Sequence, residues 1–487
     1  MARTGVEVTT ALSAGRRNNG VPSARYHLVG VTERGPVGVA QRVTSIAEYE
    51  SYFGVRTPKS EKTYNDARLF FAEGGAELFV TRVVGPGATK GFVNLMDSTG
   101  VNTVRVELNE PGAFSARTTV DIDAGANDTF TFTIAQDGVM KIRLTSVGSP
   151  SDLGARLLGN PLVSVSDLGS PAAAPGNNPV PTTTPVPLSE GVDDFVNVAV
   201  DEYVAALAAT GDDTRGGAVA VPDLPADIIG PDLIEHAKEY QKVALLCGDV
   251  HSTQAEIAGM AQPLAALEGA DHAGVFWPYL VMKDEDNGGA RYVAPTGYVA
   301  AVRARAHTTV GYWQIPAGER SAARSVVGLH TPVDTRKNDA LADSYVSGII
   351  QDGGVIKLYN WWSLSQDRAN FGYLSVRDEL NNIAMDLASE FKQFIFATWD
   401  SRGKLLNQIS SAAKGILATL AERDAVAARF SEADGSQLDP GYTINVDAPS
   451  GGLVEQNTIL VRVEVRTPQT AQLIRVEVVR VPLDGAL

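Results

Sequence analysis

The chain has 487 residues, of which 44% are hydrophobic and 20% are charged, a composition that is ordinary for a globular protein with several domains. Its 57 acidic residues outnumber its 41 basic residues, and the net charge of −16 repels nucleic acid backbones and anionic membrane surfaces. We therefore expect neither direct binding of nucleic acid nor insertion into a membrane.

The single cysteine, Cys247, excludes an internal disulfide and lies in an apolar segment where a buried, unreactive thiol is expected. The amino terminus has no apolar segment of signal-peptide length, and no run of about 18 or more apolar residues occurs along the chain. These features favour a protein that is made in a reducing cytoplasm and stays soluble.

Residues 1–25 are expected to form an arm rather than part of a domain. Residues 5–9 alternate apolar and polar side chains as a β-strand does, with Val6 and Val8 on one face. The glycine, arginine and asparagine residues at 15–20 then provide a flexible connection. Because one short strand is not stable alone, the arm needs the edge of another sheet, which a second subunit can supply.

Residues 26–84 predict a strand, two helices and a second strand. The apolar run Leu28–Val31 predicts the first strand, which the turn Gly35–Pro36 follows. Ser45 is followed three residues later by Glu48, and this spacing is typical of a capping box that begins a helix. The remaining signals are Gly54 at the end of that helix, Gly74–Gly75 at the end of the second helix and the strand Leu78–Val80.

The exact residues of this module indicate a protein family more specifically than its hydrophobic periodicity does. The segments GVTERGP, VTSIAEYESYFG and LFFAEGGAELFVTRVVG follow one another along the chain. In order and spacing they resemble the amino-terminal module of contractile tail sheath proteins, which occur in phages with contractile tails and in related injection machines. That family carries a GrT-x-x-GP turn, a t-S-f-x-E-F-x-x-x-FG helix and an FFxNGG-x-x-x-x-V-x-RV strand. Three linked motifs are much more specific than one.

Residues 91–190 differ in sequence pattern from the segments on either side. Four segments alternate apolar and polar residues between turns rich in Gly, Asn and Asp, which predicts a small antiparallel β domain. Residues 169–187 are rich in proline and predict a linker without a core of its own. The resemblance implies that this region is a peripheral insertion on the outside of a tube.

From residue 191 onward the sequence again predicts alternating strands and helices. Residues 218–222 and 243–247 predict buried strands on either side of a helix at 232–240. Residues 274–279, 294–305 and 310–318 resemble the family segments yyPW, PPSGhvAGvyAr and GvwkAPAG, with Ala-Pro-Thr-Gly in place of PPSG. Residues 361–364, Trp-Trp-Ser-Leu, stand where the family has WGaRTL, so the family arginine and any contact that it makes are missing.

Two amphipathic helices are predicted next. Ser375 and Asp378 are spaced as a capping box for the first helix, and residues 393–396 predict a short strand after it. The second helix has an apolar face of Leu405, Ile409, Ala413, Ile416 and Leu420. Three cations lie near its start, Arg402, Lys404 and Lys414, and their ordinary role is a solvated helix face. The resemblance implies instead that they contact an inner tube.

The last segment, 458–487, predicts a β-hairpin in which residues 459–466 pair with residues 473–481 around Pro468. A hairpin alone leaves two open edges. The resemblance implies that such strands, together with the amino-terminal arm, are donated to the sheets of neighbouring subunits. The residues expected to exchange in this way are Val6, Val8, Ile459, Val461, Val463, Ile474, Val476 and Val478.

The sequence weakly supports one alternative, an enzyme with a metal site. Asp249 and His251 follow an apolar strand, as in a hydrolase with a metal site, but no second ligand cluster is evident, and a zinc or two-metal site needs three or four ligands. Asp271–His272 is the only other close pair. Phosphate-binding and nucleophile-elbow motifs are also missing. We predict no enzyme activity, cofactor or metal.

The predicted fold is mixed α/β and multi-domain, with an α/β sheath core, an inserted antiparallel β domain and extended amino- and carboxy-terminal β arms. The predicted segments are the arm 1–25, the two parts of the core at 26–90 and 191–350, the insertion 91–190, a carboxy-terminal sheath domain 351–457 and the arm 458–487.

The resemblance implies a structural subunit that polymerises as stacked rings around an inner tail tube and contracts to drive it through a host envelope for genome delivery. The implied partners are further copies of the chain, the tube protein, and baseplate and tail terminator proteins. The implied location is a virion tail that is assembled in the host cytoplasm. A tailocin or another non-phage injection system remains an open alternative.

Overall fold

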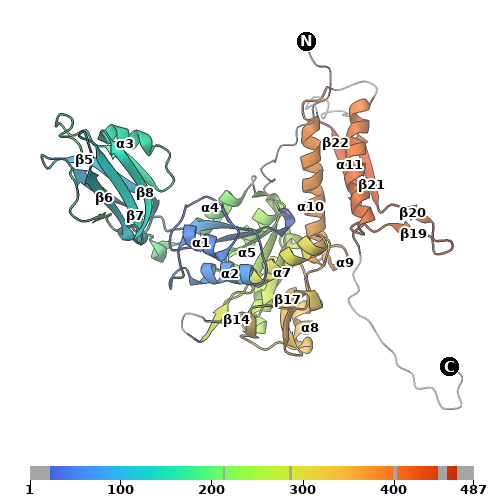
Figure 1. The fold of residues 1–487 in the computed structure, drawn as a ribbon. Coiled ribbons are helices and arrows are strands. Elements are labelled where there is room, and N and C mark those ends of the chain that lie inside the picture. Colours follow the sequence, from blue (N-terminus) through green and yellow to red (C-terminus); the bar gives the residue numbers. More distant parts are fainter. Residues whose placement is uncertain (1–21, 212–213, 285–287, 399–402, 448–457, 469–487) are drawn as a thin grey trace, which may run out of the picture. The chain divides into compact units, whose positions relative to one another are not determined.

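The computed structural model describes residues 22–211, 214–284, 288–398, 403–447 and 458–468 (Figure 1). The chain forms two compact units, Met1–Asp378 and Glu379–Leu487. Val6, Val8, Arg402, Ile474, Val476 and Val478 lie outside the described residues. No helix among the described residues is long and apolar enough to cross a bilayer.

The first unit is built on an eight-stranded sheet with the order β18-β17-β13-β12-β11-β1-β3-β2. Its six central strands are parallel, and its two edge strands are antiparallel to their neighbours. Every residue of β1, β3, β11, β12 and β13 is buried, as expected for parallel strands that are covered on both faces. The strands are β1 (Tyr26–Val31), β2 (Gln41–Val43), β3 (Leu78–Val83), β11 (Ala218–Ala220), β12 (Val243–Cys247), β13 (Ala273–Trp277), β17 (Val346–Asp352) and β18 (Val355–Leu358).

Helices cover both faces of this sheet (Figure 1). Alternate residues of β1 face opposite cores, with Tyr26 and Leu28 in one and Val29 and Val31 in the other. The first core takes side chains from α1 (Ile46–Phe53), α2 (Glu61–Ala72) and α7 (Thr296–Thr309). The second core takes them from α4 (Val200–Leu207), α5 (Ala226–Glu239), α6 (Gln254–Leu264) and α8 (Thr335–Asp343).

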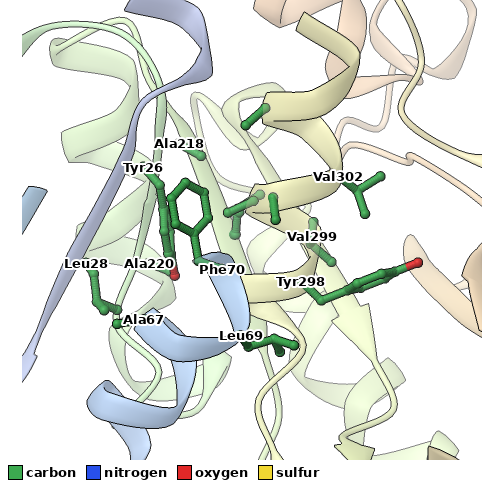
Figure 2. Packing of buried hydrophobic residues seen from close by; sticks show 14 of the residues in the cluster. Tyr26, Leu28, Ala67, Leu69, Phe70, Ala218, Ala220, Tyr298, Val299 and Val302 are labelled. Carbon is green, nitrogen blue, oxygen red and sulfur yellow. The ribbon is translucent and has the colours of Figure 1, made fainter. Parts of the chain in front are cut away.

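Helix α7 lies in the centre of the first core. Figure 2 shows Tyr26 of β1 and Phe70 of α2 on one side of this helix, and Tyr298 and Val302 of the helix itself pointing to the other side. The rings of Tyr26 and Phe70 pack with their centroids 5.2 Å apart. Because α7 is buried on nearly all sides, it can hold charged side chains only where partners inside the protein satisfy them.

The described segment between β3 and β11 forms two small antiparallel sheets with their own hydrophobic core. One sheet has the order β4-β5-β9 and the other has the order β10-β6-β7-β8. The elements are β4 (Lys90–Met96), β5 (Asn102–Pro111), β6 (Thr118–Ala124), β7 (Phe130–Gln136), β8 (Val139–Val147), α3 (Pro150–Arg156), β9 (Val163–Asp167) and β10 (Val186–Pro187). We call residues 90–187 the insertion.

A third small sheet in the first unit, β15-β14-β16, consists of β14 (Leu280–Lys283), β15 (Ala290–Val293) and β16 (Val326–Leu329). Helix α9 (Arg368–Phe371) precedes α10 (Leu374–Phe391), which begins in the first unit and continues into the second. The second unit contains the rest of α10 and then α11 (Lys404–Glu422), β19 (Arg429–Phe430), β20 (Gln437–Asp439), β21 (Tyr442–Asp447) and β22 (Leu460–Val465). The predicted mixed α/β class is confirmed.

The structure confirms one predicted capping box and contradicts the other. Ser45 begins α1, and its hydroxyl accepts a hydrogen bond from the backbone N–H of Glu48 at 3.1 Å. Ser375, by contrast, lies inside α10, which already begins at Leu374. The carboxylate of Asp378 pairs with Arg303 of α7 instead of capping the helix. A long-range ion pair has therefore replaced the predicted local bond.

The strand predicted at residues 393–396 is also wrong. Lys392–Phe394 form a 3₁₀ helix, after which Ile395 and Phe396 are exposed. A short apolar run does not by itself distinguish a strand from other local structure, because a strand also needs a partner to pair with. Among the described residues, no strand pairs with this segment.

Candidate assembly surfaces

The carboxyl edge of the central sheet is where doubly wound proteins commonly bind ligands, at the point where the strand order reverses. Here that point lies between β1 and β11. Asp223, just after β11, accepts hydrogen bonds from the backbone N–H of Val31 at 2.8 Å and from the hydroxyls of Thr63 and Tyr203 at 3.2 and 3.1 Å. A Cβ on Gly30 would lie 2.1 Å from the Thr63 hydroxyl oxygen. The chain's own side chains fill the switch point.

The candidate residues Asp249 and His251 follow β12 at the same edge. The Asp249 carboxylate lies 3.7 Å from the amino group of Lys62, and the ring of His251 contacts that of His330 at 5.5 Å between centroids. Burial raises the pKa of the nearby Cys247 thiol to about 12, so that it is protonated at neutral pH. Within the described ranges, no group of three or more His, Cys, Asp or Glu side chains is arranged to hold a metal ion.

Helix α11 of the second unit has the predicted amphipathic character. Leu405, Ile409, Ala413, Leu417 and Leu420 are buried, whereas Ile416, which we expected on this face, is only partly buried. Lys404 and Lys414 are both exposed. Lys404 also borders a groove of about 630 Å³ that polar side chains of α11 share with residues 390–394. Two of the three predicted tube-contacting cations are therefore accessible on one helix.

The strand β22 pairs with β21, which precedes it in sequence, and residues 473–481, its predicted hairpin partner, lie outside the described residues. Val461 lies opposite Val446, and Val463 lies opposite Ile444. Both valines are partly buried, Ile459 directly precedes the strand, and β21 packs against α11. β21 was not predicted from the sequence, although its residues YTINVD alternate as a strand does.

The sheet β21-β22 has two strands within the part of the chain that the structure describes. Each strand therefore pairs with its partner along one edge, and its second edge has no partner strand among these residues. A two-stranded sheet with apolar residues on one face is only marginally stable alone, and an added strand extends both its hydrogen bonding and its core. This sheet is the candidate receptor for a donated strand.

Ser23, near the start of the described residues, is linked through Arg303 to the amino-terminal part of α10. The carbonyl oxygen of Ser23 accepts hydrogen bonds from Arg303 at 2.6 Å and from the ring of His307 at 3.2 Å. Arg303 also pairs with Asp378 in the second turn of α10. Arg303 therefore links the first described residues of the chain to the amino-terminal part of α10.

The sequence alone finds no relatives in two comparisons. No protein-family model matches the chain, and a search of curated proteins gives no significant match.

Solved structures of similar fold cover almost the whole chain. A sheath tail protein from Listeria innocua is 12% identical, with a TM-score of 0.65 over 91% of both chains. A sheath tail protein from Desulfitobacterium hafniense is 15% identical, with a TM-score of 0.57 over 91% of this chain and 93% of that one. The helical sheath of the anti-feeding prophage in its contracted state is 12% identical, with a TM-score of 0.53 over 98% of this chain and 99% of that one. The chain thus has the fold of contractile tail sheath proteins, as the sequence motifs predicted.

Proposed function

We propose that this protein is the subunit of a contractile sheath, which polymerises around an inner tube and contracts to drive that tube through an envelope. The observation that carries the proposal is the fold similarity to solved sheath proteins over at least 91% of the chain. Because one fold can serve several functions, the proposal also depends on the surfaces described above.

Strand exchange is the proposed link between subunits. The sheet β21-β22 accepts a strand from a neighbouring copy, and the segments containing Val6 and Val8 or Ile474, Val476 and Val478 are the donors. Backbone hydrogen bonds in such a sheet hold subunits together without fixing the angle between their bodies. The links therefore survive while the subunits rotate.

The exposed cations of α11 are the proposed contact with the inner tube. Lys404 and Lys414 are exposed on this helix, and Arg402 stands two residues before its first residue in sequence. One exposed ion pair contributes only about 0–1 kcal/mol. Repetition around every ring of a tube raises the total, because each further contact is made at high effective concentration.

The carboxyl edge of the central sheet, between β1 and β11, is where enzymes of related topology bind ligands. In this protein we propose that it has a structural role and no catalytic one. Asp223, Thr63 and Tyr203 occupy that position with mutual hydrogen bonds. Work is then done by repacking of subunit contacts, since an extended polymer that is held in a metastable state releases free energy when it contracts.

The particle that carries this sheath need not be a phage. Structures from the anti-feeding prophage and from an extracellular contractile injection system cover 98% of this chain, compared with 91% for the two sheath tail proteins. An injection particle is the second candidate, because sheath proteins of such particles share this fold. Neighbouring genes for a capsid and a terminase would identify a phage, and their absence would identify an injection particle or a tailocin.

The direct test is negative-stain electron microscopy of the purified full chain. Hollow striated tubes are expected, and a wide bore would indicate the contracted form. The chain should then be mixed with its tube and baseplate proteins. A chain that stays monomeric in both preparations would contradict the proposal.

A further inference from the structure

The turn after β1 fastens the insertion to the core of the first unit. This turn contains Glu33, Arg34 and Gly35, the centre of the GVTERGP segment. The backbone N–H of Gly35 donates to the carboxylate of Glu110 at 2.9 Å, and its carbonyl accepts from Arg82 at 3.0 Å. Gly35 has φ +115°, and a Cβ there would lie 2.5 Å from the ring of Phe53. Glycine is therefore required for this close approach.

Arg82, near the end of β3, makes the buried contacts between the core and the insertion. Its side chain is fully buried and joins three segments: it donates to the carbonyls of Gly35 and Pro111, the latter at 2.9 Å, and pairs with Asp193 at 2.6 Å. The second oxygen of Asp193 accepts from the backbone N–H of Ala113 at 3.1 Å. Loss of Arg82 would leave these buried and partly buried acceptors without their charged donor.

Four side chains make the outer part, which we call the quartet: Glu33, Arg34, Arg117 and Asp137. Arg117 pairs with Glu33 at 2.6 Å and with Asp137 at 3.2 Å, while Asp137 pairs with Arg34 at 2.8 Å. Positive and negative groups alternate, and two belong to the core while two belong to the insertion. Glu33 and Arg34 are held in turn by the N–H of Val55 and the carbonyl of Glu50.

The two connections to the insertion are also joined to each other. Thr89 and Val192 exchange backbone hydrogen bonds of 2.8 and 3.0 Å, and the N–H of Gly85 donates to the carbonyl of Asp193 at 3.0 Å. The segment Gly85-Pro86-Gly87 would predict a flexible hinge from its composition. These bonds instead tie it to the returning chain.

We propose that Arg82 and the quartet hold the insertion and the core as one rigid body, so that the insertion follows every rotation of the core. Two connections without such contacts would allow the domains to swing, which is the usual behaviour of a small polar interface. In a contracting sheath this coupling would carry the motion of the core to the insertion, an extension that depends on the proposed function. The coupling itself is a property of the single chain.

The test is double electron–electron resonance between spin labels on the full chain. Ala126→Cys in the insertion and Asp227→Cys in α5 give two exposed attachment points. The native Cys247 is buried and needs no replacement, which the unsubstituted chain should verify by taking up no label. The variants are Arg82→Met for the buried part and Arg34→Ala with Arg117→Ala for the quartet. The control is Arg156→Ala, because Arg156 pairs with Asp152 entirely within the insertion and its exposure, 40%, is close to the 44% of Arg117.

A narrow distance distribution is expected for the parent chain and for Arg156→Ala, with a width that grows roughly twofold in Arg82→Met, as for domains without a fixed interface. The exposed double variant decides the outcome if Arg82→Met does not fold. A broad distribution in the parent chain, or unchanged widths in all folded variants, would overturn the proposal. Electron microscopy of the same samples reports tube formation separately, so that failure of the coupling and failure of the sheath function are distinguishable.

Discussion

Arg303 and Asp378 form a buried ion pair that joins α7 to the second turn of α10. The guanidinium Nε lies 3.1 Å from one carboxylate oxygen, Nη2 donates to the other, and the two side chains are 1% and 2% exposed. Burial is the largest single effect and would raise the pKa of Asp378, but the attraction and hydrogen bonds of Arg303 and His307 together outweigh it, so the pKa is lowered. Arg303 also holds the carbonyl of Ser23, so one side chain fixes three segments that are distant in sequence.

Breaking this pair should destabilise the first unit strongly. We expect Arg303→Met to lower the free energy of unfolding by about 3–5 kcal/mol, because it removes the guanidinium that pairs with the buried Asp378 carboxylate. Urea unfolding followed by circular dichroism measures the change. Lys238→Ala is the matched control, since it removes an exposed pair with Glu268. A loss below about 1 kcal/mol for Arg303→Met would show that the pair contributes no more than a surface pair.

Acid should destabilise the first unit through His236. Burial, followed by the charge of Lys242, lowers the pKa of His236 to about 3, below the value of about 6.5 for an exposed histidine. The unfolded chain therefore binds a proton that the folded chain does not, and stability is lost as the pH falls below about 6.5. Relative to His236→Gln, the wild type should lose about 1–2 kcal/mol between pH 7 and pH 5. His251→Gln, at an exposed position, is the control, and a constant difference between wild type and His236→Gln would contradict the prediction.

Loss of either donated strand should prevent polymerisation. Chains without residues 1–20, or without residues from Leu473 onward, are expected to fold but to form no tubes, because each lacks a strand for its neighbour's sheet. Circular dichroism checks folding, and sedimentation with electron microscopy checks assembly. The paired substitutions Val6→Asp and Val8→Asp keep the arm at full length and should act like the shorter deletion. Tubes of normal appearance from these chains would exclude strand exchange.

Charge reversal on α11 should weaken binding to the inner tube without affecting folding. Lys404→Glu with Lys414→Glu is expected to reduce co-sedimentation with the tube protein, and salt should reduce binding of the unsubstituted sheath in the same direction. Lys238→Glu reverses one exposed charge in the first unit and serves as the control. Equal binding by both proteins at low salt would exclude α11 as the tube-facing helix.

Removal of residues 91–190 should leave assembly intact if the insertion is peripheral. Arg82 would keep Asp193 and the carbonyl of Gly35 but lose the carbonyl of Pro111, so a lower unfolding temperature is expected together with normal tubes. Differential scanning calorimetry and electron microscopy measure the two effects. A folded deletion chain that forms no tubes would place the insertion in subunit contacts.

The sequence by itself determined the features that depend on neighbouring residues. Ser45 caps α1 because its hydroxyl and the N–H of Glu48 are only three residues apart, and Gly54 ends that helix at φ +80°. The uninterrupted apolar runs identified buried parallel strands such as β12, since such strands face a core on both sides. The linked motifs also indicated the sheath fold.

Only the tertiary structure decided contacts between residues that are distant along the chain. Asp378 has the right spacing to cap a helix, yet a buried guanidinium 75 residues away binds it more favourably than a local N–H. The pairing of β22 with β21 was not predicted, because alternation defines the face of a strand but not its partner. In the same way, the Gly35–Pro36 signal predicted a turn after the first strand, but only the folded chain showed that Glu33 and Arg34 pair with charged side chains of the insertion.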